Sequence, residues 1–464
     1  MVQMHNNFFF IFLYYNSYSM TNNKTLQKAY SLSDITFAGF GYIVGAGIFT
    51  LLPFIIKYAK GNTWLAFVLG GIISILTGLS YAKLNLDLPS NDAEYSWITN
   101  AFTTKKDRET QNTKYKMTEK FARIVIYAVM ALGIAMNAAV ALSIVDLTRP
   151  YFPKISTTVL SFIIILIPSL VNMLSAKYTA KLNTGITTLT VIGLVLVIIL
   201  GLFTGTKMNE NTVLPIKGNA FNLLHGVFIT IFAFNGFQSL VQMSEEANKK
   251  SDIPKGMIGS AGLAMVFYVL IAISVISLFG VNKASKSISP IVDAFGLRFG
   301  NNAQHIVNIL AIVTMSSTLL LSTMSRSRLL KKLADLELAP PFLSKLRETV
   351  KDTKMPVNAV GVVSLLSYAL TFVKGNALEM VSNLANTIAF FIFTSVNVAV
   401  VYKYHKEKRE KQKKNEGSNE TSQEEEELEP LLQKFKGAYP SYAILGTICT
   451  AVLFFNSPKF YKIN

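Results

Sequence analysis

The chain has 464 residues, of which 51% are hydrophobic and only 15% are charged. A soluble protein has about a quarter of its residues charged, so this composition excludes an ordinary soluble domain and indicates a protein that crosses a membrane several times. The single cysteine, Cys449, excludes a disulfide framework and a cysteine-based metal site. The formal net charge of +17 does not indicate a nucleic-acid partner, because the basic residues are sorted by side of the membrane.

Eleven apolar windows, each close to the roughly 20 residues that a transmembrane helix needs, follow one another along the chain. They lie at residues 33–58, 63–87, 121–147, 156–176, 183–204, 220–243, 255–280, 303–330, 356–374, 380–403 and 439–456. We therefore expect an all-α polytopic membrane protein with about eleven transmembrane helices in a lipid bilayer. Its predicted parts are an N-terminal tail, two five-helix sets, a charged loop and an extra C-terminal helix, at residues 1–32, 33–204, 220–403, 404–438 and 439–464.

Most lysines and arginines lie in loops on the same side as the N-terminus, notably at 103–120, 326–354 and 403–414. Cytosolic loops carry such an excess, so the N-terminus is expected in the cytosol and the protein in the plasma membrane. The loop at 404–438 passes from a basic block into an acidic one, which is typical of a solvated, partly disordered segment. The alternative interpretation is that its basic half contacts anionic lipid. Translation that begins at Met20 would remove a short apolar patch.

The first window contains GFGYIVGAGIFTLLP at residues 39–53, with four glycines in nine positions. Each glycine disfavours a helix by roughly 1 kcal/mol relative to alanine. Two interpretations remain open: the glycines allow another helix to pack closely, or the helix is interrupted at VGAGIF, residues 44–49. An interruption at mid-membrane is tolerated only where it is buried in protein or lines a wet cavity.

The sixth window contains FITIFAFNGFQSLVQM, with a second weak point at Asn235 and Gly236. The first helix of each five-helix set would then be broken, which is typical of transporters built from inverted repeats. Two facing breaks offer free N–H groups for a carboxylate and free C=O groups for an ammonium. No charged residue or histidine lies between residues 35 and 56 or between 226 and 243, so a zwitterion would be bound without any charged side chain.

Four motifs, each at the expected place along the chain, resemble the amino acid–polyamine–organocation (APC) superfamily of permeases. They are VGAGIF at 44–49, FAFNGFQSLVQMSEEANKKSDIPKGMI at 232–258, LPSNDAEYSWITNAF at 88–102 and STMSRSRLLKKLADLELAPPFLSKL at 322–346. The resemblance implies a five-plus-five inverted repeat with broken helices 1 and 6. It also implies a carrier for amino acids that is driven by protons, by sodium or by exchange.

The resemblance further implies a substrate site at the two breaks. The substrate carboxylate would meet backbone amides of the first helix, and the α-amine would meet carbonyls of both helices. Phe234, or the nearby Phe232, would be the aromatic gate, and the amide side chain of Asn235 is expected to face the substrate. The implied substrate-binding residues are Ile43, Gly45, Ala46, Gly47, Ile48, Phe232, Phe234 and Asn235.

The coupling ion is left open by the residues. Some proton-coupled relatives carry a lysine in the fifth helix, seven residues after an asparagine; here Asn183 leads to Thr190. Sodium-coupled relatives use hydroxyls between helices 1 and 8, and Ser316 and Ser317 lie at the depth that such a sodium site requires. Exchange without an ion is the third alternative.

A membrane-embedded enzyme is the rival class, but its chemistry needs convergent acid–base or metal groups. The four histidines are scattered and the carboxylates form no defined pair, so we expect neither an enzyme nor a cofactor. Glu245 and Glu246 are expected to pair with basic residues and to shape an inner gate. A membrane amino acid sensor, or a carrier of polyamines or other organocations, remains an alternative. No carboxylate lies at mid-depth to receive a cationic side chain, which favours neutral amino acids over cationic ones.

Overall fold

The computed structural model describes residues 30–205, 220–348, 354–373, 377–415, 435 and 438–460. Within these ranges the chain is helical, apart from one isolated bridge and the short antiparallel pair β1 (Arg347–Glu348) and β2 (Lys354–Met355). The long helices are α2 (Leu32–Ala59), α3 (Thr63–Asp87), α6 (Thr113–Thr148), α7 (Thr157–Leu174), α8 (Ala176–Thr204), α10 (Ala220–Phe234), α11 (Asp252–Phe279), α14 (Asn301–Asp335), α15 (Val357–Leu370), α16 (Ala377–Asn415) and α18 (Ser441–Phe460).

Short helices connect the long ones. They are η2 (Lys60–Asn62), α4 (Ala93–Phe102), α5 (Lys105–Glu109), η3 (Phe237–Glu246), α12 (Val281–Ala284), α13 (Pro290–Phe299) and η4 (Pro341–Leu343). Side-chain caps begin several helices: Ser31 and Asp34 form a capping box at α2, and the Asn112 side chain accepts the backbone N–H of Tyr115 at α6. Helix boundaries that sequence patterns leave vague are therefore set by local polar residues.

The predicted all-α membrane architecture is confirmed. Every predicted window coincides with one of the long helices, the sixth with α10 followed by η3. By length and composition, 8 helical segments of the described chain are apolar enough to cross a membrane, and three shorter apolar stretches accompany them. The helices form the five-plus-five inverted repeat that the resemblance implies.

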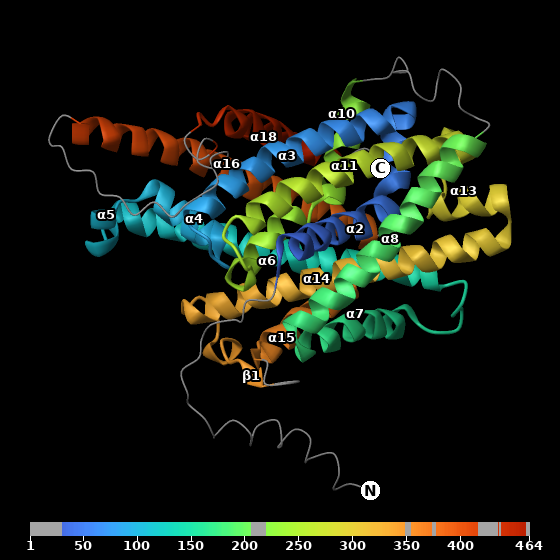
Figure 1. The fold of residues 1–464 in the computed structure, drawn as a ribbon, viewed down its shortest axis with the longest axis horizontal. Helices are drawn as coiled ribbons and strands as arrows, with labels where there is room; N and C mark the ends of the chain where they lie inside the picture. Colours follow the sequence, from blue (N-terminus) through green and yellow to red (C-terminus); the bar gives the residue numbers. More distant parts are fainter. Residues whose placement is uncertain are drawn as a thin grey trace, which may run out of the picture.

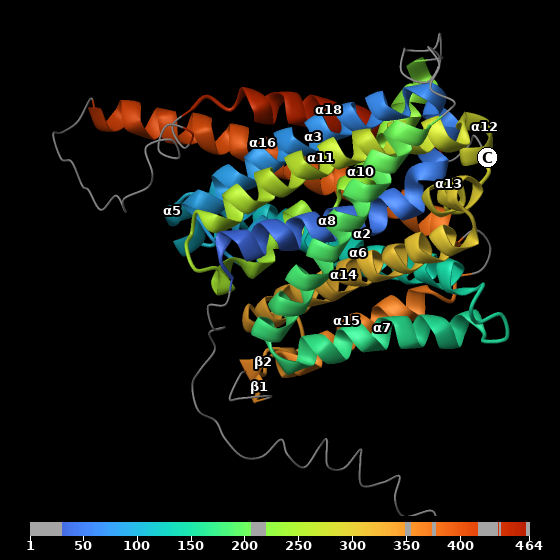
Figure 2. The same cartoon turned by 45° about the vertical axis from the view of Figure 1, so that its right-hand side comes forward.

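The bundle places the two repeat-initiating helices at its centre. Figures 1 and 2 show α2 near the middle and α10 running inward from the upper edge of the bundle, with α7 and α15 on one flank and α16 and α18 on the other. The helices α4 and α5 and the protruding basic end of α16 gather at one end of the bundle, the predicted cytosolic end (Figure 1). The predicted tail up to residue 29 and the acidic part of the charged loop, 416–434, lie outside the described residues.

The two predicted helix interruptions have opposite outcomes. The sixth helix is broken as predicted: α10 ends at Phe234, and η3 begins at Phe237. The first is not broken, because α2 runs as one α-helix through VGAGIF, so the prediction of an interruption there is wrong for this structure. The physical reason is packing: Gly45 and Gly47 give room to neighbouring helices, as the alternative interpretation expected.

Candidate functional site

The break after α10 is held open by one glycine and one glutamine. Gly236 has φ 141° and ψ −42°, a conformation that side chains with a Cβ rarely adopt. Its N–H donates to Gln238 Oε1 at 2.8 Å, which replaces the helical partner that the turn removes. A Cβ on Gly236 would lie 3.1 Å from the Tyr42 ring and 3.3 Å from the backbone nitrogen of Ile43. The break therefore lies directly against α2.

The glycines of α2 make the opposing surface. A Cβ on Gly47 would lie 2.5 Å from Ala233 Cα and 2.6 Å from the Ala233 carbonyl oxygen. A Cβ on Gly45 would overlap the hydroxyl of Thr318 on α14. Because α2 is a continuous helix, the amides of residues 45–48 point along the helix toward carbonyls four residues earlier. In this conformation they are not free to receive a carboxylate.

Tyr268 of α11 joins the two predicted half-sites. Its hydroxyl lies 2.6 Å from the Ile43 carbonyl oxygen and 2.9 Å from the Ala233 carbonyl oxygen. One hydroxyl hydrogen faces two acceptors, so the carbonyls of α2 and α10 converge on a single donor. Ile43, which was predicted to bind the substrate, here accepts a hydrogen bond from Tyr268 on its carbonyl oxygen.

Asn235 is buried at the break, and its amide side chain has no hydrogen-bond partner in the part of the chain that the structure describes. Its backbone N–H donates to Ile231 and Phe232 carbonyl oxygens at 2.9 and 3.1 Å. Among the described residues, neither Oδ1 nor Nδ2 of the side chain has a hydrogen-bond partner. An unpaired buried amide costs about 1–3 kcal/mol, and such a group marks a place where a polar ligand or water belongs.

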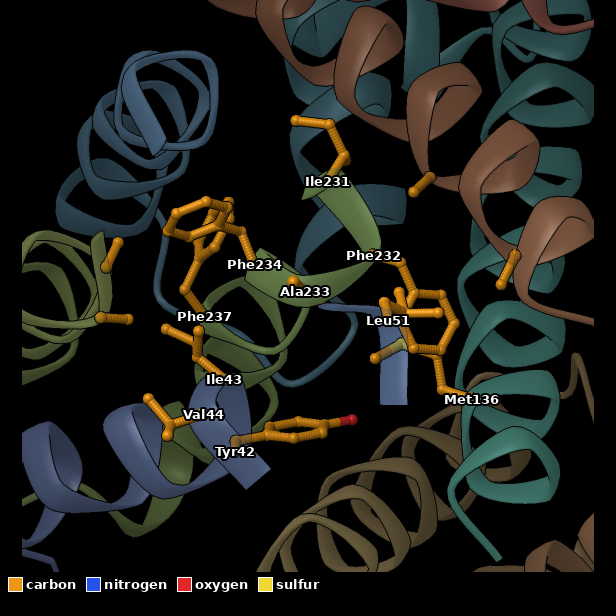
Figure 3. Close-up of a cluster of buried hydrophobic side chains, with 14 of the residues drawn as sticks. Tyr42, Ile43, Val44, Leu51, Met136, Ile231, Phe232, Ala233, Phe234 and Phe237 are labelled. Carbon is orange, nitrogen blue, oxygen red and sulfur yellow. The ribbon is translucent and has the colours of Figure 1, made fainter. Parts of the chain in front are cut away.

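The two candidate aromatic gates point in opposite directions. Figure 3 shows Phe232 directed toward Leu51 of α2 and Met136 of α6, whereas Phe234 lies on the other side of α10. The Phe234 ring contacts the Tyr268 ring, with centroids 5.2 Å apart. The structure therefore places Phe232 between α2, α6 and α10, while Phe234 belongs to the packing around α11.

Hydroxyl and amide groups gather between α2, α8 and α14. Ser317 donates to Asn183 Oδ1 at 2.6 Å, and Thr318 Oγ1 lies 3.3 and 3.2 Å from the Gly41 and Tyr42 carbonyl oxygens. Ser316 instead donates to the Ile312 carbonyl of its own helix. The structure brings Ser317 and Thr318 toward α2 and turns Ser316 away, and the sodium site stays a prediction.

Two ion pairs join α14 to η3 at the predicted cytosolic end, one of them buried and the other partly exposed. Arg328 of α14 binds Glu246 with Nε–Oε2 and Nη2–Oε1 distances of 2.9 and 3.3 Å, and both side chains are buried. Lys332 binds Glu245 at 3.1 Å. These are the pairings expected between the two glutamates and the basic segment 326–354. Tyr30 adds a backbone bridge, since its N–H donates to the Glu246 carbonyl at 3.1 Å.

An open cavity lies at the opposite end, above Leu51. Its walls come from the C-terminal half of α2 and the N-terminal halves of α10 and α16, and they include Leu51, Tyr58, His225, Glu379 and Asn386. The rings of Tyr58 and His225 stack with centroids 3.7 Å apart. Leu51 thus separates this cavity from Phe232. Among the described residues, no group of three or more His, Cys, Asp or Glu side chains is placed to hold a metal ion.

The sequence interpretation missed Tyr268 and Thr318. Tyr268 is a buried tyrosine in an otherwise apolar window, a signal that indicates a hydrogen bond to be found. Thr318 follows Ser316 and Ser317 directly, and only the rotation of α14 about its axis decides which hydroxyl faces α2. The role of Tyr268 could therefore have been predicted from the sequence, whereas that of Thr318 could not.

Comparisons with known proteins agree with this architecture. The sequence profile described as "Amino acid permease" matches residues 30–459. Cationic amino acid transporter 8, vacuolar, of Arabidopsis thaliana is 23% identical over 394 residues, which are 82% of this chain and 63% of that protein. The branched-chain amino acid permease BcaP of Lactococcus lactis subsp. cremoris (strain MG1363) is 21% identical over 403 residues, 81% of this chain and 82% of the relative.

A solved structure shares the fold. The crystal structure of MhsT in complex with L-phenylalanine superposes with a TM-score of 0.60 over 93% of this chain and 99% of the MhsT chain, at 11% sequence identity. Identity this low supports the arrangement of the helices and says nothing of the ligand. The chain spans 63% to 65% of the length of three plant relatives that it matches, the cationic amino acid transporters 8, 5 and 4 of Arabidopsis thaliana.

Proposed function

Because the chain belongs to the amino acid permease family, we propose that it is a secondary transporter that carries amino acids across a membrane by alternating access. The observation that carries this proposal is Asn235: a buried amide with no protein partner, at the only point where a central helix of the described bundle unwinds. A ligand with an ammonium and a carboxylate would supply the missing donors and acceptors.

In the proposed cycle, the structure corresponds to a state that is closed at the predicted cytosolic end and has its first helix intact. Substrate would bind between α2 and the break in α10, and its carboxylate would favour a conformation in which α2 unwinds at residues 44–49. A ligand shifts such an equilibrium by its differential affinity for the two states. Unwinding costs about 1 kcal/mol for each helical hydrogen bond lost, which charge-assisted bonds to the carboxylate offset.

The wall of the proposed site favours a neutral side chain. Ile43, Leu51, Met136 and Phe232 are all buried and apolar (Figure 3), and a cationic side chain would lack a charged partner among them. The relatives are named for different cargoes, cationic amino acids in the plant proteins and branched-chain amino acids in BcaP. We infer that a branched or other apolar amino acid fits this chain better.

Uptake and exchange in proteoliposomes test the proposal. The purified full chain is reconstituted, and the uptake of radiolabelled leucine, phenylalanine, lysine and putrescine is measured with and without the same amino acid inside. We expect a neutral amino acid to be taken up faster when the same amino acid is present inside the vesicles. Binding without any flux would identify a sensor, and putrescine flux without amino acid flux would identify an organocation carrier. Leucinamide should not compete, because it lacks the carboxylate.

The orientation has a separate test. A cysteine is introduced at Ser418, in the charged loop, in a Cys449→Ala background. An impermeant maleimide should label it only after the cells are opened. Labelling of intact cells would show that the charged loop faces outward and would contradict the proposed topology. The proposed transport activity does not depend on this result.

A further inference from the structure

Two further buried side chains of opposite charge are linked to the elements around the break, in addition to the ion pairs at the predicted cytosolic end. Glu94 is the second residue of the short helix α4, which lies outside the membrane-spanning segments, and Arg326 belongs to α14. Both side chains are fully buried. Burial of a charge is costly unless its bonding capacity is satisfied, so the contacts of both groups are informative.

Neither charged group is fully satisfied. Glu94 Oε1 accepts the Tyr81 hydroxyl at 3.1 Å, and among the described residues Oε2 has no hydrogen-bond partner. Arg326 donates to the Val129 carbonyl at 3.1 Å and to the Ser239 hydroxyl, while its Nε likewise has no partner in the described chain. A carboxyl with a free buried oxygen is stabilised when that oxygen binds a proton.

Both groups are connected to the segment that follows the break. Ser239, the partner of Arg326, belongs to η3. The Tyr81 ring packs against Trp97 of α4 and Phe237 of η3, with centroid separations of 5.3 and 6.2 Å. A movement of η3 that opens the predicted cytosolic end would therefore change the surroundings of Tyr81 and Arg326 together.

We propose that Glu94 is the binding site of a coupled proton, which it exchanges with the cytosol when η3 moves. The proposal rests on the transport function proposed above and adds the coupling ion to it. In the closed state the carboxyl is shielded from water. When η3 moves, water reaches Glu94 and the proton leaves its oxygen as hydronium, so that Glu94 is ionised beside Arg326.

The electrostatic balance at Glu94 suits this role. Burial raises the pKa of Glu94 to about 7, against the opposing effects of Arg326 and of the Tyr81 hydrogen bond. Asp92, just before α4, raises the pKa of Glu94 further. Since a small change in burial or in the distance to Arg326 moves the pKa across neutral pH, both protonation states are accessible during a cycle.

Several charged groups of the elements around α4 bind partners other than Glu94. On α6, Glu119 binds Arg123 at 2.5 Å and accepts the Tyr95 hydroxyl at 3.4 Å. On α16, Lys406 donates to the carbonyls of Asn100 and Thr103 at 3.1 and 2.6 Å. The glutamates of η3 bind Arg328 and Lys332, as described above. Two hydrogen bonds from Arg328 occupy both carboxylate oxygens of Glu246, whereas one oxygen of Glu94 has no partner in the described chain.

The decisive measurement compares net uptake with exchange. Proteoliposomes with wild-type protein should take up neutral amino acid faster when the outside is more acidic than the inside, and a pH dye should report proton movement with the substrate. Glu94→Gln, which keeps the shape of the side chain, should lose at least ten-fold of the pH-driven uptake while exchange falls by less than about three-fold. Glu119→Gln is the matched control and should keep both activities.

Tyr81→Phe is a second test variant, for which the direction of the shift in the pH midpoint of uptake is predicted. The Tyr81 hydroxyl donates to the carboxylate and favours its charged form, so its removal should shift the pH midpoint of uptake upward by about one unit. Wild-type uptake that follows a sodium gradient and ignores pH would overturn the proton proposal, as would pH-driven uptake that survives in Glu94→Gln. Absence of both uptake and exchange in the wild type would instead refute the proposed transport function.

Discussion

The first helix of each repeat has a predicted weak point that contains glycine, yet only one of the two helices is broken. In α2, VGAGIF remains helical, whereas the helix that contains FNG ends at Phe234 and resumes as η3. Glycine content does not explain the difference, since the intact segment has more glycines than the broken one. The difference lies in what surrounds the glycines.

At the broken helix, a side chain replaces the lost backbone bond. Gln238 accepts the N–H of Gly236, and the positive φ of Gly236 is open to glycine alone. In α2, by contrast, Gly45 and Gly47 lie against Thr318 and Ala233 and serve as contact surfaces. A glycine thus permits either an interruption or a close approach of helices, and the neighbouring residues select between them.

We expect the largest effect from Gly47→Leu, on the folding of the protein. The new side chain would meet the Ala233 backbone at 2.5 Å, and overpacking of this kind costs about 1–3 kcal/mol or more. We expect the folded fraction, measured by size-exclusion chromatography in detergent, to fall severely. Gly185→Leu is the control, because a Cβ at Gly185 meets nothing within 4 Å. A folded Gly47→Leu protein that lacks substrate binding would instead support a carboxylate receptor in α2, and one that binds normally would contradict both roles.

Gly236→Ala should have the next largest effect. Alanine at φ 141° is strained by about 1–3 kcal/mol, and its Cβ would press on Tyr42. A lower unfolding temperature and loss of most transport are expected. Gly262→Ala in α11 has open space around it and should leave both unchanged. Unaltered stability of Gly236→Ala would show that the break does not depend on glycine.

Asn235→Ala should separate binding from stability. Its amide makes no hydrogen bond in the described protein, so its removal should leave the unfolding temperature unchanged or higher. Substrate affinity should fall about ten-fold or more, read as loss of the thermal shift that the amino acid induces. Asn172→Ala is the contrasting variant, since Asn172 donates to the Leu320 carbonyl at 2.8 Å; it should lower stability. A stability loss in Asn235→Ala would indicate a structural role.

Tyr268→Phe should give the smallest effect. It removes the hydroxyl between the Ile43 and Ala233 carbonyl oxygens, a change worth about 1 kcal/mol. We expect a slightly lower unfolding temperature and a few-fold change in uptake. Tyr178→Phe, on an exposed position of α8, is the control and should match the wild type. An effect as large as that of Gly236→Ala would mean that Tyr268 governs the break itself.

Much of the architecture was predictable from the sequence. Each apolar window became a helix, because about 20 consecutive apolar residues are a local property that the bilayer alone requires. The break at Gly236 was also predictable, since the polar residues Asn235 and Gln238 flank a glycine within an apolar run. The identity of the family followed from four motifs in order, and the profile match over residues 30–459 confirms it.

Tertiary structure alone decided the state of α2, the hydroxyl that faces it and the burial of Glu94. Whether glycines at 45 and 47 permit unwinding or packing depends on Ala233 and Thr318, which are distant in sequence. The choice between Ser316 and Thr318 depends on how α14 is rotated against α2. From the sequence, Glu94 is a carboxylate at the end of a helix. Only the packing of the bundle buries it and brings it under the electrostatic influence of Arg326. Sequence patterns record the periodicity and apolarity of each helix, whereas a site between helices depends on contacts that no single segment contains.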